Sequence, residues 1–231
     1  MMKKILLVHP SRGRPEQAKK IYEQILNTKA VNDNTLSYIL SLDTDDPTLK
    51  TYKELFPNIT ILIHDNSCLV QAVNRAYDRD MLVTFDLVGI ATDDTYFAQN
   101  WDEELFKILD KHGYDKAIKV TSQFQGNTNL LTFPVGGNQF FLDYGTFHYH
   151  EYLSVYADDD MTEWAIKNNR YVEARHLVFP HMQYSLGPPQ NIIDQYGQIL
   201  PHDETYAKQN SAAAYEIGGK VLEKRRRNNF Q

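Results

Sequence analysis

The chain has 231 residues, of which 42% are hydrophobic and 12% aromatic. This length can bury a sizeable core in one large α/β domain or two small ones, and the composition excludes a globally disordered chain. The formal net charge of −6 at pH 7 excludes a general nucleic-acid binder. The basic run Lys224–Arg227 is an exception, and it predicts either a solvated tail or a contact with an anionic acceptor, a lipid surface or nucleic acid.

The number of cysteines and the length of the apolar runs indicate in which cellular compartment the protein is expected. The only cysteine, Cys68, excludes an internal disulfide framework and is typical of a reducing compartment. The N-terminal apolar run Ile5–Val8 is too short for a signal peptide, and no segment approaches 18 uninterrupted apolar residues. We therefore expect a cytoplasmic protein with no transmembrane segment.

The first half of the chain alternates between strand and helix patterns. Pro15 suits a first helical turn, where its missing N–H costs nothing. We expect strands at Lys4–His9, Leu36–Leu42, Ile59–Ile63, Leu82–Ile90 and Ala117–Thr121, and helices at Pro15–Asn27, Pro47–Leu55, Leu69–Tyr77 and Trp101–Leu109. Strands that alternate with helices at this spacing predict βαβ units, so the expected fold class is α/β with a mostly parallel central sheet flanked by helices.

The pattern changes after Gln123. Scattered glycines, asparagines and aromatic residues come first, and then a helix at Met161–Lys167 and a short strand at Tyr171–Glu173 are expected. From Gly187 the sequence is rich in turn residues, with a late helix at Ala212–Arg225. The chain contains no internal repeat and no low-complexity linker, which favours a single domain.

Polar residues follow the first two expected strands. Arg12 and Arg14 lie beside a strand end and a helix N-terminus, which favours a phosphate or another anion, although a solvated basic turn is the alternative. Asp43 and Asp45 can accept hydrogen bonds from a base or from ribose hydroxyls, or they can cap the next helix. An aspartate-nucleophile phosphatase is a weaker alternative, because Pro47 stands where that class needs Thr or Val.

Asp93 and Asp94 follow a mostly apolar stretch and are expected where a strand ends and a loop begins. Ligands of open α/β sheets bind at that edge, and Mg²⁺ or Mn²⁺ takes oxygen ligands that it shares with substrate phosphates. Two adjacent carboxylates repel each other unless a cation or donors compensate them. The pair therefore predicts a divalent-cation site, with capping of the helix at Trp101 as the alternative.

A second acidic cluster and a histidine occur later in the chain. Asp158–Asp160 opens an amphipathic helix, where it can supply a general base or simply complement the helix dipole. His181 follows an apolar run that ends at Pro180, and a neutral imidazole there can complete a metal site begun by Asp94. His176 is the competing candidate for this ligand.

Taken in order, these motifs resemble the GT-A type nucleotide-diphospho-sugar glycosyltransferases, especially the inverting family two, over about residues 3–185. The turn Pro10–Pro15 resembles the family's P-T/S-x-x-R-P motif, and Asp43 resembles its nucleobase-binding aspartate. The remaining matches are Ala72-Val73-Asn74 to the A-x-N segment, Thr92-Asp93-Asp94 to the metal-binding D-x-D motif, Ala157-Asp158 to the E-D motif that supplies the base, and His181 to the downstream metal-binding histidine.

The resemblance implies a single GT-A-like domain over 1–231. About 1–123 would form the nucleotide-binding half, about 124–185 the acceptor-side half, and 186–231 a C-terminal extension with the basic tail. The implied activity is a metal-dependent, inverting transfer of a sugar from a nucleotide-diphosphate donor to a hydroxyl of a glycan, protein, lipid or nucleic acid.

The resemblance also implies a role for each matched residue. Nucleotide binding falls to Pro10, Arg12, Arg14, Asp43, Asp45, Asn74 and Asp93, binding of Mn²⁺ or Mg²⁺ to Asp94 and His181, and base catalysis to Asp158 with Asp160 in reserve. Ala91 and Ala157 replace acidic residues of the family motifs, which keeps a non-catalytic nucleotide-binding relative open. A metal-dependent sugar nucleotidyltransferase is the other alternative, but it needs a glycine-rich loop that Ser11–Pro15 replaces poorly.

Overall fold

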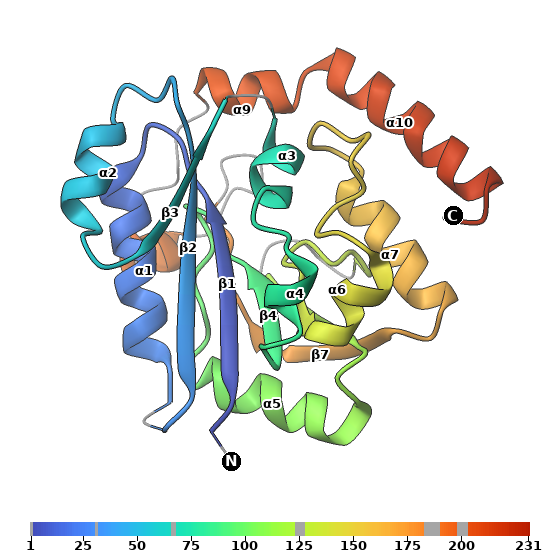
Figure 1. The fold of residues 1–231 in the computed structure, drawn as a ribbon, viewed down its shortest axis with the longest axis horizontal. Coiled ribbons are helices and arrows are strands. Elements are labelled where there is room, and N and C mark those ends of the chain that lie inside the picture. Colours follow the sequence, from blue (N-terminus) through green and yellow to red (C-terminus); the bar gives the residue numbers. More distant parts are fainter. Residues whose placement is uncertain (1, 31, 66–67, 123–127, 183–189, 198–202) are drawn as a thin grey trace.

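A computed structural model describes residues 2–30, 32–65, 68–122, 128–182, 190–197 and 203–231. Its centre is a seven-stranded sheet with the strand order β3-β2-β1-β4-β6-β5-β7 (Figure 1). The strands are β1 (Lys4–Pro10), β2 (Thr35–Asp43), β3 (Thr60–His64), β4 (Leu87–Ile90), β5 (Ala117–Thr121), β6 (Val135–Gly137) and β7 (Tyr171–Val178). Only β6 runs antiparallel to its two neighbours, so the prediction of a mostly parallel sheet is confirmed.

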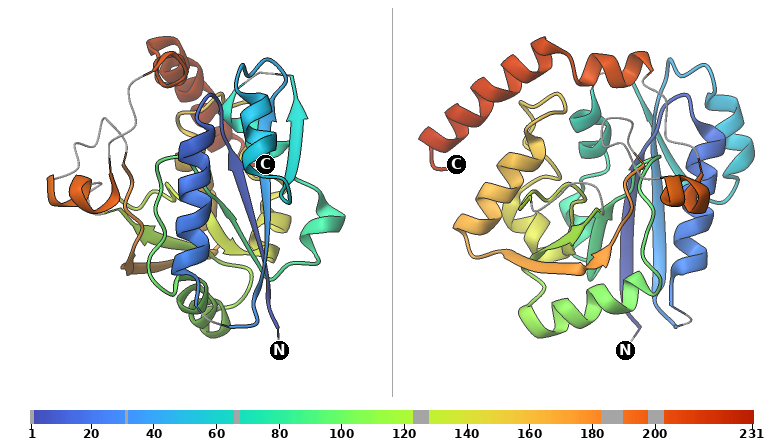
Figure 2. Two further views of the ribbon diagram at one scale, coloured as in Figure 1. Left: turned by 90° about the vertical axis from the view of Figure 1, so that its left-hand side faces the viewer. Right: turned by 180° about the vertical axis from the view of Figure 1, so that it is seen from behind.

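Helices cover both faces of this sheet (Figure 2). Along β1 the side chains alternate between two hydrophobic clusters: Ile5 and Leu7 belong to one, Leu6 and Val8 to the other. A strand buried on both faces reads as a continuous apolar run, as expected for a parallel sheet. The first cluster includes residues of α1 (Pro15–Thr28), α2 (Leu49–Leu55) and α5 (Trp101–His112), and the second includes residues of α3 (Leu69–Asn74), α4 (Arg79–Leu82), α6 (Asn138–Tyr144) and α7 (Ala157–Lys167).

Two short helices and one long helix complete the described chain. They are α8 (Gln190–Tyr196), α9 (Glu204–Gln209) and α10 (Ala212–Arg227). Of these, α9 and the start of α10 lie near the carboxyl ends of β1 and β2. Figure 1 shows α9 above the end of the sheet where β1 and β2 finish, and α10 running from there along α7. Within the described residues, no helix combines the length and apolar character needed to cross a membrane.

Several element boundaries differ from the sequence-based expectation. The strand expected at Leu82–Ile90 begins only at Leu87, because Asp78 caps the helical turn α4 by accepting a 3.0 Å hydrogen bond from the Met81 amide. The helix expected from Met161 begins at Ala157, which places the acidic cluster inside the first turn of α7. The strand expected to end at Glu173 continues to Val178.

The antiparallel strand β6 was not predicted, because it is short and contains two glycines. A Cβ atom on Gly137 would collide with the backbone carbonyl of Tyr114, and one on Gly136 would collide with that of Lys116. Glycine is therefore required where β6 passes this close to another segment of backbone. The local hydrophobic pattern of the sequence does not indicate such a contact between distant segments.

The basic run at the end of α10 is not a free tail. Lys224 contacts Glu151 at 2.7 Å, Arg226 contacts Glu163, and Arg227 lies 4.0 Å from Glu223. Arg225 is buried, and its Nε donates to Asp160 at 2.8 Å. Lys224, Arg226 and Arg227 remain 51–76% exposed, as expected of a solvated run, and the pairs of Lys224, Arg225 and Arg226 form a clamp that joins α10 to α7 and to the loop before it.

Candidate active site

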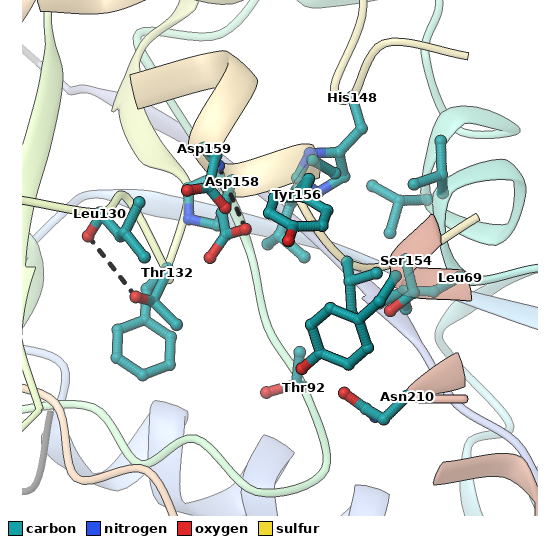
Figure 3. A pocket seen from close by; sticks show the side chains of 18 residues that line it. Leu69, Thr92, Leu130, Thr132, His148, Ser154, Tyr156, Asp158, Asp159 and Asn210 are labelled. Atoms are coloured by element: carbon teal, nitrogen blue, oxygen red, sulfur yellow. Dashed lines mark hydrogen bonds between the residues drawn. The ribbon is translucent and has the colours of Figure 1, made fainter. Parts of the chain in front are cut away.

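Two cavities adjoin at the carboxyl ends of β1, β2 and β4. The larger cavity has a volume of about 570 Å³ and is lined by the β1–α1 turn, the ends of β2 and β4, and α9. The smaller cavity has a volume of about 350 Å³ and is lined by α3, residues 130–134 and the start of α7 (Figure 3). Six of the described residues line both: Leu69, Thr92, Thr132, Phe133, Ser154 and Asn210. Because β1 lies between β2 and β4, this is the switch point where open α/β sheets bind ligands.

Asp93 is the centre of a buried network on the floor of the larger cavity. His9 Nε2 lies 2.9 Å from its Oδ1, and Ser11 Oγ donates to its two oxygens at 2.8 and 2.9 Å. Ser11 also bonds Tyr52 at 2.6 Å, and Tyr38 contacts the other nitrogen of His9. These bonds satisfy a carboxylate that is only 5% exposed, and they hold the loop after β4 against the end of β1.

Asp94, the next residue in the same loop, contacts His181 and not the network around Asp93. Its Oδ2 lies 3.2 Å from His181 Nε2, and Thr92 Oγ1 donates to its Oδ1 at 2.7 Å. Burial alone would raise the pKa of Asp94, but His181, Thr92 and Arg14 lower it to about 2. Asp94 is therefore a carboxylate at any physiological pH.

Backbone pairing brings His181 to this position. The Met182 amide donates to the Asp94 carbonyl at 2.7 Å, and the Tyr96 amide donates to the Pro180 carbonyl at 2.9 Å. His176, in contrast, is exposed on β7 and lines neither cavity. Of the two candidate histidines, the structure brings only His181 to Asp94.

The Asp94–His181 pair fits two neighbouring positions of an octahedral cation. With metal–ligand bonds of about 2.1 Å, adjacent ligand atoms lie about 3 Å apart, which is close to the observed 3.2 Å. Among the described residues, no group of three or more His, Cys, Asp or Glu side chains gathers around a common point. A cation here would therefore take its remaining ligands from substrate phosphates and water.

The arginines of the larger cavity are paired with carboxylates. Arg12 bonds Asp45 at 2.6 Å and Asp43 at 3.1 Å, and Arg75, which lies outside the lining and which sequence reasoning missed, bonds Asp43 at 2.7 Å. Arg14 contacts Asp203 and lies 3.6 Å from Asp93. The described residues of the lining include four carboxylates and three cations: Asp43, Asp93, Asp94 and Glu204 against Arg12, Arg14 and Lys208.

The first turn of α7 sends its carboxylates in different directions. Asp158 and Asp159 line the smaller cavity, and the Asp159 amide donates to Asp158 Oδ1 at 3.1 Å. Burial raises the pKa of Asp158, and burial together with the charge of Asp158 raises the pKa of Asp159 to about 6.

Asp160 is fully buried and lines neither cavity. Its carboxylate accepts hydrogen bonds from Tyr144 at 2.6 Å, Tyr152 at 3.1 Å and Arg225 at 2.8 Å. Asp160 is thus a structural group, and the expectation that it is the reserve base is not supported.

Two further sequence predictions have different outcomes. Pro10 lines the larger cavity beside Ser11. Asn74 lines neither cavity, because its amide is paired on both sides with the backbone of His148, at 2.7 and 2.9 Å. Asn74 therefore fixes the loop at His148 to α3, in place of the expected contact with a nucleotide.

The C-terminal extension contributes to both cavities, which the sequence did not indicate. Lys208 lines the larger cavity, Tyr215 lines the smaller one, and Asn210 lines both. Asp203 caps α9 by accepting a 2.8 Å bond from the Tyr206 amide, and it also contacts Arg14. The ion pair thus connects the first βα turn to the extension.

Comparison with solved structures finds this architecture among nucleotide-sugar transferases. TarS 1–349 from S. aureus in complex with UDP is 14% identical and has a TM-score of 0.58; the match covers 77% of this chain and 59% of TarS 1–349. A mannosyltransferase from Pyrobaculum calidifontis in complex with GDP-Man and Mn²⁺ is 12% identical over 97% of this chain and 75% of its own, with a TM-score of 0.59. A 4-diphosphocytidyl-2C-methyl-D-erythritol synthase from Anaerococcus prevotii is 12% identical over 84% of this chain and 95% of its own, with a TM-score of 0.52.

No family model and no curated protein sequence matches the chain. The chain spans 59% of the length of TarS 1–349. At these low identities the similarity establishes the fold, which transferases of sugars and of nucleotides share. The expected resemblance to GT-A glycosyltransferases is therefore confirmed at the level of the fold: the chain has a GT-A-type α/β fold.

Proposed function

We propose that this chain is a glycosyltransferase that moves a sugar from a nucleotide-diphosphate donor to a hydroxyl acceptor, with Mn²⁺ or Mg²⁺ and with inversion at the anomeric carbon. One observation carries the proposal: the cavity lined by Asp94 and His181 shares a wall with the cavity lined by Asp158. A donor in the first and an acceptor in the second would meet at that wall. The GT-A-type fold, whose solved examples include complexes with UDP and GDP-Man, supports this assignment.

The charge of the larger cavity supports a cation requirement. Its four carboxylates exceed its three cations, so a bare diphosphate would be repelled. A divalent ion held by Asp94 and His181 would neutralise the charge that develops on the departing diphosphate. Arg12 and Arg14 would assist at the phosphates, with Asp93 positioning the loop beneath them. Pro10, Asp43 and Asp45 would then face the nucleoside.

The smaller cavity would hold the acceptor hydroxyl against Asp158. A carboxylate whose pKa is raised is a better proton acceptor than an ordinary one. Asp158 would remove the hydroxyl proton as the oxygen attacks the anomeric carbon from the face opposite the diphosphate. This direction of attack, across the shared wall, is what predicts inversion.

The test is to replace the base while the donor site stays intact. Asp158→Asn keeps the size of the side chain, so donor binding measured by calorimetry should not change, while sugar transfer should fall by at least ~100-fold. Glu163→Gln changes a carboxylate on the same helix that lines neither cavity, and it should retain transfer. Full transfer by Asp158→Asn would remove this residue from the mechanism.

The released product separates the proposed activity from nucleotidyl transfer. Sugar transfer releases a nucleoside diphosphate, whereas nucleotidyl transfer to a sugar phosphate releases pyrophosphate. Chelation of divalent ions should weaken donor binding by at least tenfold, and Mn²⁺ or Mg²⁺ should restore it. Pyrophosphate release with a nucleoside triphosphate would support the nucleotidyltransferase alternative, and donor binding without turnover would support a non-catalytic relative.

A further inference from the structure

Within the proposed function, we infer that the smaller cavity binds an uncharged, polyhydroxylated acceptor such as a neutral sugar, and that His148 is a residue that recognises its hydroxyls. Three independent features of the cavity carry this inference: an unpaired imidazole nitrogen, the sign of the charge on the walls, and two tyrosine rings. The volume of about 350 Å³ lies at the lower end of ordinary small-molecule pockets, about 300–1,000 Å³.

The imidazole of His148 is fixed in place but has an unpaired polar atom. The backbone of His148 is held by Asn74 on both its amide and its carbonyl. The side chain is 8% exposed and lines the smaller cavity, and Figure 3 shows it directed into that cavity. Its Nδ1 is buried and has no hydrogen-bond partner among the described residues. An unpaired buried nitrogen is costly, so a ligand that bonds to it gains affinity.

The protonation state of His148 selects the kind of partner. Burial lowers its pKa to about 4, although the charge of Asp160 opposes the shift, so the ring is neutral at pH 7. A neutral imidazole has one donor and one acceptor nitrogen, and a hydroxyl can pair with either. It gives no charge-based attraction to a phosphate or a carboxylate.

The charge of the walls disfavours an anionic acceptor. The described residues that line the smaller cavity include Asp158 and Asp159 but no Lys or Arg. Residues 1, 31, 66–67, 123–127, 183–189 and 198–202 contain neither Lys nor Arg in the sequence. The ammonium of Lys119 bonds the Leu130 carbonyl and is not part of the lining. Like charges disfavour a phosphorylated acceptor here, whereas the two carboxylates can accept bonds from sugar hydroxyls.

Two tyrosines supply aromatic surface for the apolar face of a sugar ring. Tyr156 and Tyr215 both line the cavity, with ring centroids 5.9 Å apart in an edge-to-face arrangement. Tyr156 has a φ of 69°, and Gly218 of α10 lies directly against it, where a Cβ would come within 2.8 Å of its Cδ2. The close approach of α10 therefore holds Tyr156 in an otherwise uncommon conformation. An amphipathic ring next to polar groups suits a ligand that is both hydroxylated and apolar on one face.

The wild-type protein gives the first test. With a donor that the protein turns over, neutral monosaccharides and their methyl glycosides are compared as acceptors with the corresponding sugar phosphates. We expect transfer to neutral acceptors, and at least tenfold lower kcat/KM for each phosphorylated counterpart. A preference for the phosphates would overturn the inference and leave the proposed function standing, whereas no turnover or binding of any nucleotide sugar would overturn the proposed function itself.

Substitution of His148 tests the recognition residue. His148→Phe keeps a planar ring but removes both nitrogens, so the acceptor KM should rise about tenfold, the scale of one hydrogen bond, while donor Kd stays constant. His148→Asn restores a polar side chain near the Nδ1 position and should recover part of the loss. His176→Phe, at an exposed position outside both cavities, is the matched control and should change nothing.

Folding is monitored by thermal melting, and a second readout is made on the wild-type protein. Titration of the wild type with a methyl glycoside should shift the imidazole NMR signals of His148, assigned by comparison with His148→Phe or His148→Asn, whichever folds. An unchanged acceptor KM in a folded His148→Phe, or unshifted His148 signals at saturating glycoside, would contradict the role of this residue.

Discussion

Adjacent carboxylates in this chain are distinguished by their surroundings and not by their sequence. The carboxylate of Asp93 is hydrogen-bonded to His9 and Ser11. The neighbouring Asp94 lies 3.2 Å from His181, a distance that suits a shared cation. Asp160 is paired with Arg225, whereas Asp158, two residues earlier, lines a cavity. Each cluster thus combines a structural carboxylate with one that is available for chemistry.

Asp159 should make the stability of the protein depend on pH. Its pKa is raised from 3.8 to about 6, so between these values the folded state holds a proton that the unfolded chain releases. Stability therefore falls as the pH rises through this window. Asp159→Asn removes the effect, and we expect it to raise the free energy of unfolding by about 1 kcal/mol at pH 7, after allowance for partial exposure, and by close to nothing at pH 4.

Urea unfolding at pH 4 and pH 7 measures this difference. Asp80→Asn, at an exposed site in α4, is the control and should show no pH-dependent gain. Equal stabilisation of Asp159→Asn at both pH values would show that the carboxyl is not perturbed.

At the scale of elements, the clamp between α10 and α7 holds the start of α7 beside the smaller cavity. Arg225 and Asp160 form a buried ion pair, with side chains 6% and 0% exposed. Removal of one partner leaves an uncompensated buried charge, so Arg225→Met should destabilise the fold by about 3–5 kcal/mol. The same change at the next position, Arg226→Met, breaks an exposed pair with Glu163 and should cost less than about 1 kcal/mol.

Chemical denaturation of both variants provides the comparison. Since α10 also packs against Tyr156 through Gly218, Arg225→Met should raise the acceptor KM as well as lower the stability. Equal losses of stability for the two arginine variants would show that the buried pair is not the clamp.

Sequence patterns predicted the helices and strands whose own residues show an apolar run or an amphipathic period. β1 contains a continuous apolar run, β2 and β5 are mostly apolar, and α1 and α5 have clear amphipathic periodicity, so their positions were predicted to within a few residues. β6 is defined by close backbone contact and not by any pattern. α8 and α9 are six or seven residues long within a turn-rich stretch, too short to show a period.

At the scale of the whole molecule, the site combines residues from both ends of the chain. Positions at strand ends, such as Pro10, Asp43 and Asp94, could be predicted because parallel strands deliver their carboxyl ends to one edge of the sheet. His148 and Lys208 could not be predicted as lining residues, because neither follows a strand and their placement depends on how distant segments pack. Sequence reasoning thus identified the lining of the larger cavity better than that of the smaller one.

The charge balance of the larger cavity makes a final prediction about Lys208. Of the three cations in its lining, Arg12 and Arg14 are paired with carboxylates, whereas Lys208 makes no ion pair with any described residue. Its ammonium can therefore contact a donor phosphate without first breaking an ion pair. Lys208→Ala should raise the donor Kd about tenfold, and the salt dependence of binding should become shallower because one charge contact is lost.

Calorimetry of a nucleoside diphosphate with Mn²⁺ at two salt concentrations measures both effects. Lys111→Ala, an exposed lysine on α5 outside both cavities, is the matched control and should leave both values unchanged. If Lys208→Ala binds as tightly as the wild type, the C-terminal extension lines the donor cavity without recognising the phosphates. Donor affinity would then rest on the cation held by Asp94 and His181 and on the arginines of the first βα turn, which would first have to leave their carboxylate partners.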